Sequence, residues 1–391
     1  MKISTAFAGF YIPLRMEQKK KIAFVSNTLW SIFRFRFSLI RQLLKDDYNV
    51  LVVAPEDNTR PHFDNIENLE FVPLRHLKQG FSSPWGELKL KKELEQVYLQ
   101  HNPDLVFHYT IKPNIFGTLA ARSAGIPCIA VVTGMGYAFI NSGILGLLVI
   151  PLYRNAARKA NQVWFLNEGD KIHFIRKGII RRTPSLILPG EGIDTEKFQP
   201  MANNSREPEK IRFLMIARLL NNKGVREFVS AAAQVKSKFP DIEFTIAGSY
   251  DPSLPDSIPE ELFNQISDGK RISYVSQSQD IRNEIRQADA VVLPSYAEGL
   301  SMSLMEAAAM EKPLIATNVS GCRELVMHGI SGYLCEVKNA HDLAEKMIRF
   351  IQLPAENKLM MGKNGRKLMI EKFDLKEVIH IYKENIRQLL P

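Results

Sequence analysis

Residues 291–308 read VVLPSYAEGLSMSLMEAA, which predicts a strand, a turn and the start of a helix. Residues 291–293 are short, apolar and partly β-branched, as in a buried strand, and Pro294 and Gly299 interrupt that pattern. Apolar residues then recur at helical spacing from residue 301 onward. Glu298 is therefore expected in the loop beyond the carboxyl end of a strand, and Glu306 in the first turns of the next helix. Open α/β sheets bind their ligands at this edge.

Two carboxylates in this arrangement suit a polyhydroxylated ligand. An ionised carboxylate only accepts hydrogen bonds, and a sugar or ribose offers vicinal hydroxyl donors. The backbone N–H groups at the helix start, those of Gly299, Leu300, Ser301 and Met302, favour an anion such as a phosphate. Hydroxyls and a diphosphate in one pocket describe a nucleotide sugar. The alternative is a helix-terminal charge beside a solvated loop residue, with no ligand.

Length and composition indicate a folded protein of more than one domain. The chain has 391 residues, which suggests two domains of roughly 150 to 200 residues. Its 45% hydrophobic and 24% charged residues are typical of a globular protein. Cys128, Cys322 and Cys335 lie far apart and make no metal-ligand spacing with the histidines. A reduced, cytoplasmic setting is the simplest interpretation.

The net charge of +9 belongs to one half of the chain. Residues 1–200 hold 26 Lys and Arg against 17 Asp and Glu, whereas residues 201–391 hold 25 of each. An anionic partner is therefore expected for the first half: a nucleic acid, an acidic metabolite or the inner leaflet of a membrane. The alternative is that the excess of positive charge only keeps the surface solvated and binds no partner.

No run of about 18 apolar residues, the length of a membrane-spanning helix, occurs in the sequence. Residues 144–152, ILGLLVIPL, are apolar and precede Arg154, Arg158 and Lys159. This pattern suits a segment in a membrane interface, or a core helix with a solvated end. Residues 1–20 lack the features of a signal peptide, so we interpret them as an extension or as translation from an upstream start codon.

Strand patterns alternate with helical ones along both halves, which predicts parallel βαβ units and hence two Rossmann-like, doubly wound domains facing a cleft. The expected division is an extension at 1–20, a first domain at 21–198, a linker at 199–210, a second domain at 211–373, and a terminal helix at 374–391 that packs back on the first domain. The expected strands cover residues 22–26, 49–54, 69–73, 105–108, 128–133, 162–166, 211–217, 243–247, 272–275, 291–293 and 314–317.

The first strand of the second half leads into ARLLNNKG, residues 217–224, which places Arg218 and Lys223 in the following loop. This loop opens on the same sheet edge as the one that carries Glu298. Arginine can form two parallel bonds to phosphate oxygens and lysine adds a mobile charge, so the pair suits a diphosphate. A solvated loop is the alternative for either residue alone.

These motifs carry a family resemblance that covers nearly the whole chain. ARLLNNKG, AGSYD, PSYAEGLSMSLMEA and SGCREL resemble the retaining glycosyltransferases of family 4, whose two-domain fold is called GT-B. FRFRFSLIRQL, KPNIFGTLAAR and TGMGYAF in the first half make the chain similar to bacterial enzymes that extend lipid-linked oligosaccharides in N-glycan, O-antigen or capsule assembly.

The resemblance implies a role for each donor-site residue. Arg218 and Lys223 would bind the donor diphosphate, Glu306 the ribose hydroxyls and Glu298 the transferred sugar, with the amides of residues 299–302 near the β-phosphate. It also implies retention of the anomeric configuration, for which we favour departure and attack on the same face. No cofactor is expected besides the UDP-sugar substrate, and no metal ion, because no Asp-x-Asp pair occurs.

Candidates for the acceptor site lie in the first domain. Arg36 at a helix start, His108 and Lys112 after one strand, and Gly134 and Gly136 after another are positioned to bind an acceptor pyrophosphate. A solvated helix start and a simple turn are the alternatives. In a dinucleotide fingerprint that begins at Gly134, the third glycine position would hold the bulky Phe139. A nicotinamide site is therefore improbable.

The chain departs from many of the proteins it resembles at two places. Asn27-Thr28-Leu29 replaces a glycine pair, and no histidine adjoins Gly134. The acceptor contacts and any general base therefore stay open.

The sequence predicts a cytoplasmic, metal-independent glycosyltransferase, peripheral on the inner face of the membrane, with no nucleic acid partner. It would move a sugar, with an N-acetylhexosamine among the candidates, from a UDP-sugar to a polyprenyl-diphosphate-linked sugar in glycan assembly. One alternative is an enzyme of the same fold with a soluble acceptor. The other is a non-catalytic protein that binds a polyanion through its first domain.

Overall fold

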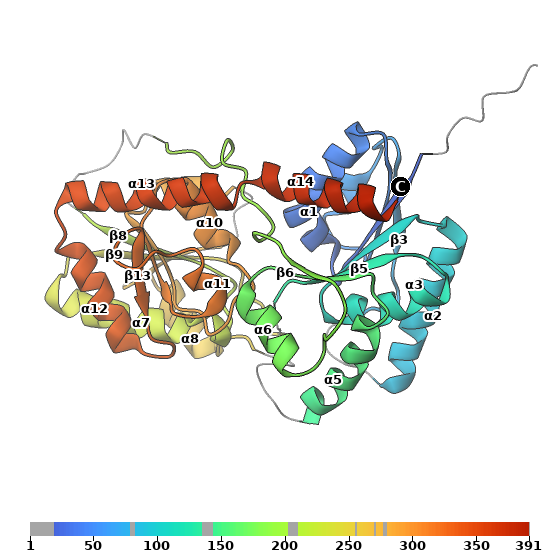
Figure 1. Ribbon diagram of the computed structural model, residues 1–391. Coiled ribbons are helices and arrows are strands. Elements are labelled where there is room, and N and C mark those ends of the chain that lie inside the picture. The colour runs from blue at the N-terminus through green and yellow to red at the C-terminus, as the bar shows by residue number, and fades with distance from the viewer. Residues whose placement is uncertain are drawn as a thin grey trace, which may run out of the picture.

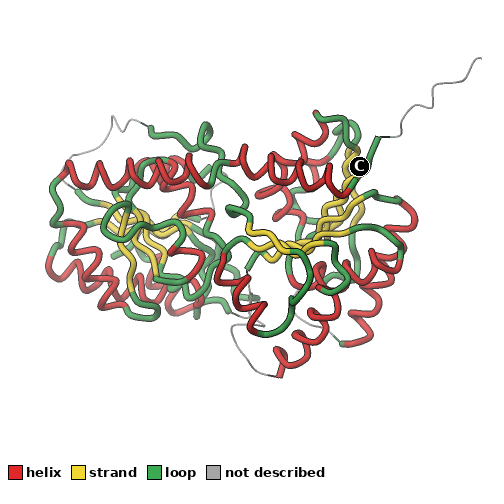
Figure 2. The backbone as a smooth tube through the Cα atoms, in the orientation of Figure 1, coloured by secondary structure: helices red, strands yellow, loops and turns green. Residues whose placement is uncertain are grey.

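The computed structural model describes residues 19–78, 83–134, 144–201, 210–254, 256–269, 271–276 and 280–390. Most of the predicted extension at 1–20 and of the predicted linker at 199–210 lies outside these residues. The chain forms two α/β domains, seen side by side in Figure 1 and as a backbone tube in Figure 2. All the described strand pairs are parallel. The fold class is therefore the predicted pair of Rossmann-like domains.

The first domain is built on a seven-stranded sheet in the order β3-β2-β1-β4-β5-β6-β7. Its strands alternate their side chains between two apolar layers, so both faces of the sheet are covered by helices. The helix α1 (Leu29–Lys45) packs on one face, and α2, α3 and α5 pack on the other. The strands are β1 (Lys21–Val25), β2 (Asn49–Ala54), β3 (Leu69–Pro73), β4 (Leu105–Tyr109), β5 (Cys128–Val132), β6 (Gln162–Phe165) and β7 (Ser185–Ile187), and the other helices are α2 (Pro84–His101), α3 (Thr118–Ser123), α5 (Ile144–Ala157) and α6 (Glu168–Arg176).

The second domain has six strands in the order β10-β9-β8-β11-β12-β13. The helices α7 and α12 cover one face of this sheet, and α10 and α13 cover the other. The strands are β8 (Arg212–Ile216), β9 (Glu243–Ala247), β10 (Ser273–Val275), β11 (Ala290–Leu293), β12 (Leu314–Thr317) and β13 (Gly332–Cys335), and the helices are α7 (Val225–Lys238), α8 (Glu260–Ser267), α9 (Arg282–Gln287), α10 (Met302–Ala309), α11 (Ser320–Arg323), α12 (Ala340–Ile351) and α13 (Ala355–Lys372).

The strand order of each sheet reverses direction at its centre. In the first sheet the reversal lies between β1 and β4, and in the second between β8 and β11. At such a switch point the loops that follow the two central strands diverge, which opens a crevice at the carboxyl edge. Arg218 and Lys223 follow β8, and Glu298 follows β11. The predicted donor residues therefore lie at the switch point of the second sheet.

Two chain crossings join the domains and bond to each other. The amide of Ile193 donates to the carbonyl of Phe373 (2.8 Å), and the amide of Leu375 donates to the carbonyl of Ile193 (3.0 Å). Beyond this point α14 (Leu375–Leu389) leaves the second domain and lies along the first (Figure 1). Its Tyr382 is buried against Phe107 and donates to or accepts from the Tyr109 hydroxyl at 3.0 Å. The terminal helix thus packs on the first domain.

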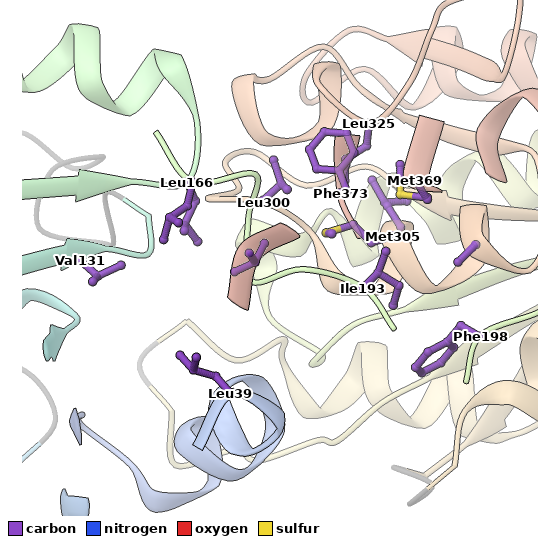
Figure 3. Close-up of a cluster of buried hydrophobic side chains, with 14 of the residues drawn as sticks. Leu39, Val131, Leu166, Ile193, Phe198, Leu300, Met305, Leu325, Met369 and Phe373 are labelled. Carbon is purple, nitrogen blue, oxygen red and sulfur yellow. The ribbon is translucent and has the colours of Figure 1, made fainter. Parts of the chain in front are cut away.

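One hydrophobic cluster runs through both domains. It includes Leu39 and Leu166 of the first domain and Leu300, Met305 and Met369 of the second (Figure 3). Its continuity means that the domain contact is made partly by core packing. Among the residues that the structure describes, no helix is long and apolar enough to cross a membrane.

Candidate functional site

The loop after β8 packs tightly against the end of β11. Gly224 has a φ of +75°, and a Cβ placed on it would lie 2.1 Å from the carbonyl oxygen of Pro294. Only glycine fits this conformation and this distance without strain. The amide of Tyr296 and the hydroxyl of Ser295 both donate to the carbonyl of Asn222, at 2.8 and 3.1 Å. These contacts hold the two loops of the switch point together.

Lys223 and Glu298, which were predicted separately as donor-site residues, form an ion pair across these two loops. The Lys223 ammonium lies 2.6 Å from the Glu298 carboxylate, and their side chains are 21% and 10% exposed. The pair is therefore partly shielded from water but open on one side. Arg218, in the same loop as Lys223, is exposed.

Glu306 lies in the helix after that loop. Ser301 caps α10, its hydroxyl accepting a bond from the amide of Leu304, and the first amides of a helix have no intrahelical acceptor. Glu306 lies in the second turn and its side chain is only 2% exposed. It forms an ion pair with Arg34, which comes from α1 in the other domain.

Burial raises the pKa of Glu306, because a carboxylate loses its hydration inside the protein. Arg34 and then Lys197 oppose this shift of the pKa, and Asp280 adds to it. Arg34 is thus the main cation that stabilises the charge on Glu306.

A cavity of about 390 Å³ lies between the domains and contains both Glu306 and Arg218 in its wall. Glycine is required in this wall, since a Cβ on Gly248 would lie 1.8 Å from the carbonyl oxygen of Ala217. Lys223 belongs to the same loop as the lining residue Arg218, and Glu298 lies in the loop that leads into α10, which carries the lining residue Glu306. The lining residues are Trp30, Arg34, Ile216, Ala217, Arg218, Ala247, Gly248, Ser249, Ile281 and Glu306.

The loop after β11 also touches the loop after β5 in the first domain. A Cβ on Gly299 would lie 2.1 Å from the carbonyl oxygen of Thr133 and 3.2 Å from the Cα of Gly134. Asn167, at the start of α6, donates a side-chain hydrogen bond to the carbonyl of Gly299. Gly134 therefore lies opposite the donor-site loop, while Gly136 lies outside the described residues.

The prediction that His108 binds the acceptor is wrong in this structure. Both faces of β4 are buried, and His108 points toward α2 and α3, where its Nε2 lies 2.8 Å from the Tyr98 hydroxyl and its ring fills the space beside Gly117. The side chain is 0% exposed, and burial lowers its pKa to about 3, so it is neutral. His108 is a core residue.

The predicted roles of Lys112 and Arg36 are also corrected. Lys112 is buried and its ammonium lies 2.7 Å from the Glu87 carboxylate. Arg36 is 3% exposed, forms an ion pair with Glu191 and lies 4.1 Å above the centre of the Tyr109 ring. Because α1 begins at Leu29 instead of near residue 35, Arg36 lies two turns inside the helix, where it faces the core.

Sequence reasoning missed the contributions of Trp30, Arg34 and Asn167. The helical period of α1 places Arg36 on the buried face, with positions 29, 32, 39, 40 and 43. The same period places Arg34 on the opposite face of the helix, so it gave no sign of a contact there. Asn167 gave a weak signal, as a helix cap after a strand.

The sequence and the structure are similar to those of known glycosyltransferases. The model for glycosyl transferases group 1 matches residues 197–368, and the model for glycosyl transferase 4-like matches residues 21–167. Over 364 residues the chain is 30% identical to a Campylobacter jejuni protein, covering 88% of this chain and 93% of that one. That protein is named N,N'-diacetylbacillosaminyl-diphospho-undecaprenol alpha-1,3-N-acetylgalactosaminyltransferase. The chain belongs to the group 1 glycosyltransferases.

Other relatives of this glycosyltransferase agree with that assignment. It is 27% identical over 301 residues to the Escherichia coli UDP-Gal:alpha-D-GlcNAc-diphosphoundecaprenol alpha-1,3-galactosyltransferase, covering 74% of this chain and 76% of the relative. The structure of a Rickettsia africae glycosyltransferase superposes with a TM-score of 0.77 at 19% identity, covering 95% of this chain and 99% of that one. Anabaena HepE in complex with UDP-glucose gives a TM-score of 0.76 at 20% identity, covering 94% and 99%. This glycosyltransferase therefore has the GT-B fold.

Proposed function

We propose that this glycosyltransferase transfers a sugar from a UDP-sugar to a polyprenyl-diphosphate-linked sugar, with retention of the anomeric configuration. The observation that carries the proposal is the meeting of two carboxylates and two cations at one switch point. Arg218 and Glu306 line a cavity between the domains. Lys223 and Glu298 form an ion pair between the loops that follow the same two central strands. The cavity has the size expected of a small-molecule site.

Each part of the donor has a matching group in this arrangement. The nucleoside would occupy the cavity, where Glu306 accepts bonds from the ribose hydroxyls. The diphosphate would lie between Arg218, Lys223 and the N-terminal amides of α10. The transferred sugar would then reach Glu298, whose carboxylate accepts from sugar hydroxyls while Lys223 keeps its charge balanced.

The chemistry follows from the charge that develops during transfer. Breaking the anomeric bond leaves UDP with an additional negative charge on its β-phosphate, and cations fixed at that position lower the barrier. We propose that Arg218, Lys223 and the helix amides supply this stabilisation without a metal ion. We also propose that departure and attack use the same face of the sugar, since Glu298 holds the sugar and does not attack it.

The names of the relatives support a lipid-linked acceptor. The Campylobacter jejuni and Escherichia coli relatives are both named for sugars on diphospho-undecaprenol, and their matches cover 88% and 74% of this chain. A surface on α2 that is both hydrophobic and basic suits binding to a membrane that contains anionic lipid. Trp85 and Leu88 are 75% and 42% exposed, and Lys89 and Lys92 lie on the same side of the helix. We propose that the enzyme binds peripherally to the inner face of the cell membrane through this surface.

The donor site is tested by the variants Arg218→Ala and Lys223→Ala. Each should lower kcat with a UDP-sugar by roughly 10²-fold, because a charged contact that strengthens in the transition state is lost. Lys238→Ala, at the far end of α7, is a matched control that should keep normal turnover. Turnover is measured as UDP release in the presence of the lipid-linked acceptor. Near-normal activity of both site variants would contradict the assignment.

A further inference from the structure

The first domain contributes a charged wall to the proposed nucleotide cavity. Arg34 projects from the second turn of α1 and contacts Glu306 through one guanidinium nitrogen and one carboxylate oxygen. Its side chain is 33% exposed and lines the cavity together with that of Trp30. The contact therefore leaves other guanidinium donors of Arg34, and the second oxygen of Glu306, for further bonds.

Glu306 needs this partner in order to act as an acceptor. Its carboxyl is nearly inaccessible to water, and an isolated charge at such a position is costly. A protonated carboxyl would itself become a donor and would hold vicinal hydroxyls less well than a carboxylate. Of the charged groups that act on Glu306, Arg34 and Lys197 favour its ionised form, and Asp280 opposes it. Arg34 is the group in direct contact.

The position of Arg34 is itself fixed by the start of its helix. Thr28 caps α1 by accepting from the amide of Ser31, and the amide of Trp30 donates to the Asp57 carboxylate at 2.8 Å. The Trp30 ring packs edge-on against Phe35, with 5.6 Å between the ring centres. The first two turns of α1 are thereby held in one orientation toward the second domain.

We propose that Arg34 is a positioning residue for the donor nucleotide, which acts by holding the Glu306 carboxylate ionised and aimed at the ribose. This inference rests on the proposed function, in which Glu306 receives the ribose hydroxyls. Because Arg34 and Glu306 belong to different domains, the ribose site is complete only when the domains are in contact.

The test is calorimetric binding of UDP and of 2′,3′-dideoxy-UDP to the full-length enzyme and its variants. In the unmodified enzyme, loss of both ribose hydroxyls should weaken binding by about tenfold or more. In Arg34→Gln, UDP should bind at least about tenfold more weakly, and the difference between the two nucleotides should shrink. The double variant Arg34→Gln/Glu306→Gln should lose no more affinity than Glu306→Gln alone.

The dependence on pH separates this role from a purely structural one. Removal of Arg34 takes away the cation that opposes the raised pKa of Glu306, so the pKa rises further. As the pH is lowered, the affinity of Arg34→Gln for UDP should therefore begin to fall at a higher pH than the affinity of the unmodified enzyme. Arg34→Lys, which keeps a positive charge, should recover part of the loss. Arg41→Gln, an exposed position on the same helix, should bind UDP normally.

Three results would overturn the inference. If Arg34→Gln weakens both nucleotides equally, Arg34 acts on the diphosphate directly and not through Glu306. If Arg34→Gln binds UDP normally, Arg34 does not position the donor. If the unmodified enzyme binds UDP and its dideoxy analogue equally well, the ribose does not use Glu306, although the proposed UDP-sugar donor would stand. Absence of any UDP binding by the unmodified enzyme would contradict the proposed function itself.

Discussion

Individual charged residues at the domain contact are held in pairs that differ in exposure. Lys223 and Glu298 form a partly open pair, whereas Glu306 is almost fully buried against a more exposed Arg34. Lys223 and Glu298 keep some contact with water, which lowers the cost of holding their charges. A buried carboxylate is more dependent on its partner. Glu298 and Glu306 thus differ in how strongly each carboxylate depends on its paired cation.

Asp170 provides a test of burial that is independent of the donor site. It lies at the start of α6, is 4% exposed, and its Oδ2 has no hydrogen-bond partner among the described residues. Burial raises its pKa to about 7 from an ordinary value of 3.8, with a smaller contribution from Glu324 of the other domain. Between about pH 4 and pH 7, the folded protein therefore keeps a proton on Asp170 that the unfolded chain has already released.

This raised pKa predicts a pH-dependent stability. The contribution of Asp170 is fully present below the pKa of the unfolded chain and is lost as the pH rises toward 7, by up to about 4 kcal/mol. Asp170→Asn should therefore raise the melting temperature at pH 8 by several degrees and leave it unchanged at pH 4. Asp241→Asn, at an exposed carboxylate, is the control. An equal effect of Asp170→Asn at both pH values would show that its carboxyl is not protonated in the fold.

At the level of helices, strands and loops, the repeating pattern predicted the elements well and their contacts poorly. Short apolar runs in the sequence predict strands such as β4 and β11, and glycines in the loops indicate where strands end. Two short strands were missed, β7 because its residues are only half-buried and β13 because it begins with Gly332. His108 was misassigned because β4 is buried on both faces, so its strand pattern does not reveal which face is the core.

The positions of the candidate donor residues in the fold could be predicted because each lies next to a local signal in the chain. Lys223 and Glu298 follow recognisable strand ends. The Arg34 contact could not be predicted in the same way, since it joins residues 272 positions apart and depends on how the domains meet. The pattern of neighbouring residues carries no information on contacts between residues so far apart in the sequence. The sequence therefore predicted where candidate residues lie within one domain, and it did not predict the contacts that depend on both domains.

The close approach of the β11 and β5 loops predicts that Gly299 cannot carry a side chain. A Cβ there would press against the Thr133 carbonyl and force the two loops apart. Gly299→Ala should lower kcat/KM roughly tenfold to a hundredfold, because the donor-site loop is displaced. Gly365→Ala, inside α13 where a Cβ would meet only ordinary contacts at 3.6 Å or more, should keep activity. Equal activity of both variants would contradict this account of the loop.

The exposed face of α2 predicts a specific defect in membrane binding. The double variant Trp85→Ser/Leu88→Ser should sediment less with vesicles that contain anionic lipid, and added salt should weaken the remaining binding. The matched control is Leu359→Ser/Met360→Ser on α13, where the side chains are 55% and 56% exposed in the second domain. Unchanged sedimentation of the α2 variant would place the membrane contact elsewhere.

For the molecule as a whole, the terminal helix fastens one domain to the other. The chain crosses between domains at Ile193 and at Phe373, and α14 then covers a face of the first sheet. Its anchor is Tyr382, buried between Phe107 and Trp164, and an exterior ion pair joins Lys383 to Asp46 at 2.6 Å. The helix α14 therefore adds its contacts to the core packing that already joins the two domains.

Removal of the Tyr382 ring should therefore destabilise the protein. Tyr382→Ala should lower the free energy of unfolding by about 3 kcal/mol or more, because it leaves a cavity and deprives the Tyr109 hydroxyl of its partner. Tyr382→Phe keeps the ring and should cost only about 1 kcal/mol. Urea denaturation followed by tryptophan fluorescence measures both. A Tyr382→Ala protein as stable as the unmodified one would show that α14 is not an anchor.

We propose that the UDP-sugar and the lipid-linked acceptor meet between these two domains. The most direct measurement is product analysis by mass spectrometry after incubation of the purified enzyme with a panel of UDP-sugars and a short polyprenyl-diphosphate sugar, or the same sugar without its lipid diphosphate. We expect one UDP-sugar to add a single sugar to the lipid-linked acceptor in clear preference to the free sugar. Absence of transfer from every UDP-sugar, or equal transfer to the free sugar, would contradict the account.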